Sequence, residues 1–150
     1  MATSLYETDV YAWSQQQVAL LRAEDFAEVD WHNVIEEIDS VGASQRNELR
    51  NRLKELLMHL LKWQFQSEKQ SPSWYRSIQM QRNAINDLLD DNPSLRRLIP
   101  ENVAEVYPRA VRDAIVETGL PHSAFPSTCP YEPIQVMDDE FSHSRRNSNL

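Results

Sequence analysis

One charged side chain stands inside an apolar stripe of this sequence. At about 100° per residue of helix, Arg82 falls on the same face as Ile78 and Ile85. A guanidinium in a protein core needs a carboxylate or several carbonyl oxygens as partners. Glu37 is the best candidate carboxylate because it lies at the margin of the apolar face of a predicted helix, and His59 can complete the group. The sequence therefore predicts a polar cluster of Glu37, His59 and Arg82.

Two interpretations of this cluster are open. A pocket in which one of its members serves as a base with a tunable pKa would suit a small helical-bundle enzyme or a ligand-binding module. A buried ion pair that fixes the register of the helices would be structural instead. The structural interpretation is favoured, and the sequence identifies no catalytic residue.

Neither a metal site nor a cofactor is predicted. Metal sites in helical bundles usually take several Glu and His ligands, often as Glu-x-x-His repeats. This chain offers one pair at helical spacing, Glu55 and His59. The other histidines lie at a helix start, beside prolines and near the C-terminus: His32, His122 and His143.

The chain has two glycines, and each follows a helical pattern. Gly42 and Gly119 are therefore predicted to end helices, because glycine adopts the left-handed conformation at little cost. Tight hairpins, phosphate-binding loops and dinucleotide folds all depend on further glycines. The sequence therefore predicts an all-α fold, a compact bundle of about four or five helices with a proline-rich C-terminal strap.

Apolar periodicity and capping residues give the expected elements. Ser71 and Pro72 are predicted to begin a helix as cap and first helical residue. Pro100 and Pro108 are expected to kink or split the element that contains them. The expected helices cover residues 8–23, 31–41 (with Asp30 as its N-cap), 44–67 (the central helix), 72–89 and 94–118. Their apolar faces include the four tryptophans, which are predicted to pack in the core: Trp13, Trp31, Trp63 and Trp74.

Residues 1–119 are predicted to form one helical domain, on which residues 120–141 pack as the strap. Four prolines within thirteen residues favour an extended segment there. Phe125, Tyr131 and Phe141 are expected to dock on the helical body, because a free segment would leave them in water. Residues 142–150 are expected to be a disordered tail.

The net charge of −8 is unevenly distributed. Residues 1–41 hold nine acidic residues and one basic residue, whereas residues 46–82 carry a net charge of +5. This asymmetry predicts that one segment docks on the other, within a chain or between two chains. Nucleic acid is an unlikely partner because the surrounding negative charge opposes it.

The expected location is the cytoplasm. No apolar run approaches the ~18 residues that a membrane span needs, and the N-terminus lacks the features of a signal peptide. The single cysteine, Cys129, forms no internal disulfide. With no nearby histidine to activate it, a packed anchor is favoured over a nucleophile.

Several sequence blocks resemble the bacterial domain-of-unknown-function family 29, which is abundant in cyanobacteria. The resemblance implies an all-helical fold with no established activity, and Pro100 and Pro108 depart from the family's more continuous helix. The favoured function is association, as a homodimer or with another bacterial protein. The blocks that carry the resemblance are LYETDVYAW (5–13), EEIDSVG (36–42), LMHLLKWQ (57–64), Ser73-Trp74 with Gln81-Arg82, PSLR (93–96), and Cys129-Pro130-Tyr131 with DDEF (138–141).

Overall fold

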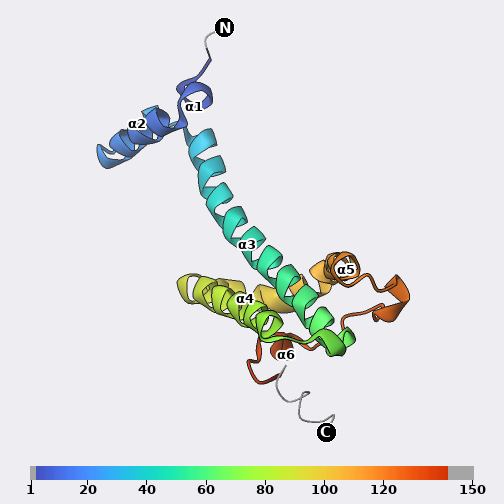
Figure 1. Cartoon of the computed structure of the whole chain (residues 1–150). Coiled ribbons are helices and arrows are strands. Elements are labelled where there is room, and N and C mark those ends of the chain that lie inside the picture. The colour runs from blue at the N-terminus through green and yellow to red at the C-terminus, as the bar shows by residue number, and fades with distance from the viewer. Residues whose placement is uncertain (1–2, 142–150) are drawn as a thin grey trace. The chain divides into compact units, whose positions relative to one another are not determined.

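The computed structural model describes residues 3–141, and the predicted tail lies outside the described residues. Every regular element in this range is helical, which confirms the all-α fold (Figure 1). The chain divides into two compact units, Met1–Ser44 and Gln45–Leu150. Residues 1–119 were predicted to form one domain, with no boundary at this point.

The N-terminal unit contains α1 (Leu5–Thr8), α2 (Val10–Arg22) and the beginning of α3 (Trp31–Phe65). The single helix predicted over residues 8–23 is wrong at its start. Asp9 ends α1 and its carboxylate accepts a hydrogen bond from Ala12 N, so that a second helix begins at Val10. The small core of this unit consists of Trp13, Val29 and Val34.

The predicted helix end at Gly42 is also wrong. α3 runs without a break from Trp31 to Phe65, so the two helices predicted on either side of Gly42 are one. Gly42 does not have a positive φ, and a Cβ added there would meet nothing within 4 Å. A helical glycine costs about 1 kcal/mol relative to alanine, which a helix already propagating on both sides can offset. Residues 31–44 of α3 belong to the N-terminal unit.

The C-terminal unit packs the rest of α3 with α4 (Pro72–Asp91), α5 (Ile99–Thr118) and α6 (Pro133–Met137). Ser71 caps α4 through a hydrogen bond from Trp74 N to its hydroxyl, and Pro72 occupies the first turn, as predicted. The apolar face of this part of α3 includes five fully buried leucines: Leu49, Leu53, Leu56, Leu57 and Leu61.

The prolines of α5 do not split it. Pro100 lies in the first turn of α5, where a backbone N–H would have no acceptor within the helix, so the proline removes no helical hydrogen bond. Pro108 lies inside the helix with its ring exposed, and α5 continues past it to Thr118. Gly119 then ends the helix at φ 71°, as predicted, and its N–H donates to Ile115 O.

The strap, residues 120–141, packs on the C-terminal unit. Phe125 and Tyr131 are buried in the core, and Phe141 packs against it half-buried. The Tyr131 hydroxyl donates to Gln64 Oε1 (2.7 Å), and the Tyr107 hydroxyl donates to Pro126 O (2.6 Å). Side chains and hydrogen bonds together therefore tie the strap to α3 and α5.

Candidate functional site

Glu37 is held by a tyrosine of its own unit. The Tyr6 hydroxyl, on α1, donates to Glu37 Oε1 on α3 at 2.6 Å. This hydrogen bond to a carboxylate raises the pKa of Tyr6, because the acceptor favours the protonated phenol. Glu37 therefore helps to join α1 to α3.

Arg82 is fully buried on α4. Its Nε donates to the carbonyl oxygen of Val136 in α6 at 2.9 Å. Burial lowers the pKa of Arg82, and the charges of Asp139 and Asp138 oppose this effect. A carbonyl of the strap is thus one partner of the guanidinium, and the arginine links α4 to α6.

His59 is half-buried on α3. Burial is the main cause that lowers its pKa, and the charge of Lys62 adds to it. Since an ordinary histidine already titrates near 6.5, the imidazole of His59 is neutral at pH 7. It can therefore accept a proton or a hydrogen bond.

The three residues of the predicted cluster are divided between the two units. Glu37 belongs to the N-terminal unit, whereas His59 and Arg82 belong to the C-terminal unit. The hydrogen bonds described for Glu37 and Arg82 go to Tyr6 and to Val136, respectively. A shared pocket of Glu37, His59 and Arg82 stays a prediction.

Two other candidate chemistries find little support. Within residues 3–141, no three His, Cys, Asp or Glu side chains are grouped so as to hold a metal ion. Burial raises the pKa of the Cys129 thiol, whose Sγ lies 3.5 Å from Tyr131 O. Cys129 packs half-buried against the core, so it stays protonated at neutral pH and serves as an anchor.

No helix in the described range is long and apolar enough to cross a membrane.

The N-terminal unit carries an exposed apolar surface that was not predicted from the sequence. Between 47% and 68% of each of its side chains is accessible. The four members on α3 follow one another at steps of three or four residues, and an aromatic ring contact of 6.4 Å adds the fifth. We call this set the N-terminal apolar surface: Phe26, Trp31, Ile35, Ile38 and Val41.

The four tryptophans test the expectation of core packing. Trp13 and Trp63 are buried as predicted, and Trp74 is half-buried beside the core. The prediction is wrong for Trp31, whose ring is exposed while its Nε1 donates to Phe26 O (2.9 Å). The exposed Trp31 ring is thus held in a fixed orientation.

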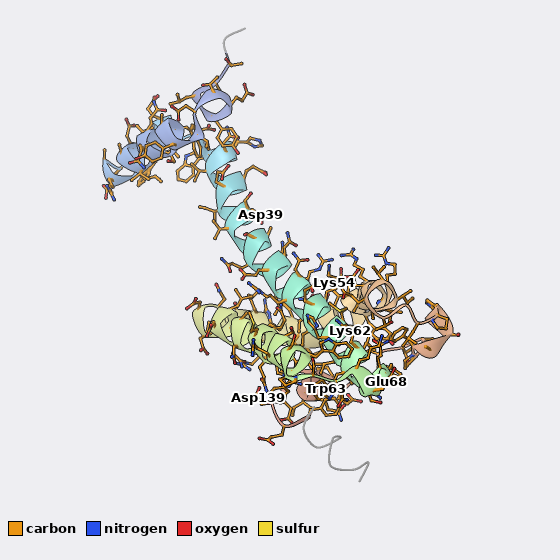
Figure 2. All side chains as sticks on the ribbon, viewed as in Figure 1. Asp39, Lys54, Lys62, Trp63, Glu68 and Asp139 are labelled. Carbon is orange, nitrogen blue, oxygen red and sulfur yellow. The ribbon has the colours of Figure 1, made fainter. Side chains whose placement is uncertain are left out.

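The N-terminal unit carries its negative charge without internal compensation. Residues 1–44 hold nine acidic residues and Arg22, a net charge of −8. No salt bridge joins residues of this unit within the described part, positions 3–44. Glu36 and Asp39 are exposed beside the N-terminal apolar surface, and Figure 2 labels Asp39 on α3.

Part of the positive charge of the basic segment is neutralised within the C-terminal unit. Bases of α3 pair with acids of α5: Arg50 with Glu105, Lys54 with Asp113 (3.5 Å) and Lys62 with Glu117 (3.5 Å). Figure 2 labels Lys54 and Lys62 along this part of α3. Residues 45–150 contain fourteen basic and fourteen acidic residues and are neutral overall. The charge asymmetry of the chain therefore resides in its N-terminal unit.

These features define an all-α protein in which one acidic unit exposes an apolar surface. Residues 5–142 match the family model described as Domain of unknown function DUF29. The chain belongs to this family, which confirms the resemblance of its sequence blocks. Comparisons with curated proteins and with solved structures give no match.

Proposed function

We propose that this protein acts by association with another protein through the N-terminal apolar surface. The observation that carries the proposal is the accessibility of five large apolar side chains on one small unit. Covering such side chains contributes on the order of 1 kcal/mol each, given how much of their area remains to be buried. Aromatic side chains commonly contribute a large share of the binding energy of an interface. Trp31 and Phe26 are the aromatic members of this surface.

The charge of the unit selects the partner. Pairing two copies through this surface would bring together two units of charge −8, which costs free energy and slows encounter. A basic surface with apolar side chains at helical spacing would meet both the apolar surface and the acids beside it. The proposed occupant is therefore a basic amphipathic helix of a different protein, encountered in the bacterial cytoplasm, and the homodimer is the competing outcome.

A pair of synthetic helical peptides tests this occupant. Both peptides carry leucines at i, i+3, i+4 and i+7, and their polar faces hold lysine in one and glutamate in the other. We expect the lysine peptide to change the fluorescence of the chain with a Kd in the micromolar range. Its affinity should fall as salt is raised. Equal binding of the two peptides, or none, would contradict the proposal.

Matched variants locate the binding surface. The double variant I35S/I38S removes two exposed apolar side chains and should weaken binding of the lysine peptide at least tenfold. The control V116S/I134S alters two side chains that are 83% and 81% exposed in the C-terminal unit, and it should bind normally. Light scattering after size exclusion completes the test. A dimer that I35S/I38S dissociates, with no peptide binding, would identify a second copy as the occupant instead.

A ligand-binding or catalytic role for Glu37, His59 and Arg82 is the second proposal. The observation that favours it is the neutral, half-buried imidazole of His59. Modification by diethyl pyrocarbonate tests whether this base faces an open pocket. Reaction of His59 at a rate close to that of the exposed His32 would support the role, whereas protection of His59 by tenfold or more would exclude it.

A further inference from the structure

Asn102 is a buried amide on the apolar face of α5. It follows Ile99 and precedes Val103 and Val106, which are all buried, and it is itself only 6% exposed. Its Nδ2 has no hydrogen-bond partner among the described residues. Because a buried donor without an acceptor is costly, native proteins rarely leave one unless a water, an ion or a ligand satisfies it.

Asn102 is one of the residues that line a cavity beside α3 and α5 in the C-terminal unit. The cavity has a volume of about 330 Å³, and its wall includes Arg46, Arg50, Glu101, Asn102 and Glu105. A second donor in the wall is also unsatisfied, since Arg50 Nε is buried without an acceptor while another nitrogen of the same guanidinium pairs with Glu105. Two of the residues that line this cavity, Asn102 and Arg50, therefore each carry a buried N–H donor without an acceptor from the described residues.

The remaining charges complete the character of the cavity. Arg46 is exposed and forms no ion pair with a described residue, so its guanidinium is available to an anion. Glu101 is exposed on the same wall and has no described salt bridge either. Glu105 is already neutralised by Arg50. The wall thus presents one free positive and one free negative group beside the two unsatisfied donors.

We propose that this cavity binds a small zwitterion, an α-amino acid. Its carboxylate, which only accepts hydrogen bonds, would take those of Asn102 Nδ2 and Arg50 Nε and face Arg46. Its ammonium group, which only donates, would face Glu101. The volume lies at the lower end of the range for ligand pockets, which suits a molecule of this size. The site is independent of the N-terminal apolar surface.

Nuclear magnetic resonance reads this site directly. The side-chain NH₂ of Asn102 gives two resonances, and we expect alanine to shift them saturably with a Kd on the order of 1 mM or below. Acetate lacks the ammonium group and glycinamide lacks the carboxylate, so each should bind at least tenfold more weakly. Sodium chloride at the same ionic strength is the control for salt effects.

Variants separate binding from stability. N102A removes the amide and should abolish the response of neighbouring backbone resonances to alanine, whereas N86A, at an exposed asparagine of α4, should leave it intact. E101Q keeps the shape of the wall and should reduce the affinity for alanine to that for acetate. If N102A does not fold, E101Q alone decides. The proposal would be overturned if the Asn102 resonances do not shift at an alanine concentration 50-fold above the expected Kd of about 1 mM. Equal responses to alanine and to acetate would also overturn it.

Discussion

Deletion of residues 120–150 removes the strap and exposes what it covers. Phe125, Tyr131 and Val136 are at most 5% exposed, and each contributes about 1.5–3 kcal/mol when fully buried. Their sum, roughly 4.5–9 kcal/mol, is an upper bound, because ordering the segment costs conformational entropy. The deletion also takes the Val136 carbonyl away from the buried Arg82 guanidinium. Since whole domains are stable by only about 5–15 kcal/mol, the C-terminal unit should lose most of its stability.

Thermal unfolding followed by circular dichroism measures the effect. We expect the chain that ends at Gly119 to aggregate, or to melt at least roughly 10 °C below the full chain. The matched control ends at Phe141, keeps every described contact of the strap and should melt with the full chain. If the chain that ends at Gly119 stays monomeric and melts within about 2 °C of the control, the strap contributes no stability and the reasoning is refuted.

Three further predictions concern local features. G42A should raise the free energy of unfolding by about 0.5–1 kcal/mol because Gly42 is helical with open space around its Cα. G119A should lower the free energy of unfolding because Gly119 has a φ of +71°. Urea unfolding of both variants measures the two opposite effects. Y6F should cost the N-terminal unit about 1 kcal/mol by removing the hydrogen bond to Glu37, which the fluorescence of its tryptophans reports in the same experiment. The pKa of His59, lowered by burial, should lie below 6.5 in a proton NMR titration. Because the unfolded chain then binds more protons, stability should fall as the pH drops below 6.5, and H59Q should remove this component; a pKa of 6.5 or above would contradict it.

Helix starts and ends could be predicted from the sequence where a single capping residue determines them. Ser71 and Pro72 begin α4 and Gly119 ends α5, because cap geometry depends on a few neighbouring atoms. The same rule failed at Gly42, where the cooperativity of a 35-residue helix outweighs the preference of one residue.

Side-chain partners were harder to predict than elements. The burial of Arg82 follows from its place in the apolar stripe, and one of its acceptors is a backbone carbonyl 54 residues away. Because every residue carries such a carbonyl, the sequence does not indicate which one accepts this hydrogen bond. Asn102 offered one signal that could have been used, an amide between Ile99 and Val103 on an apolar face.

The apolar periodicity of α3 predicts helix but does not predict which stretch of the helix is buried. Residues 31–41 and 49–61 have similar apolar spacing, yet Ile35 and Ile38 are exposed whereas Leu49 and Leu53 are fully buried. The difference lies in the chain available to cover each stretch. The C-terminal unit has α4, α5 and the strap for this purpose, whereas the N-terminal unit has 44 residues and a core of three buried side chains. A unit so small buries a low fraction of its apolar surface by itself. Apolar periodicity that stays exposed in its own unit is therefore the basis of the proposed association surface, and the charge of −8 is the reason for proposing a basic partner.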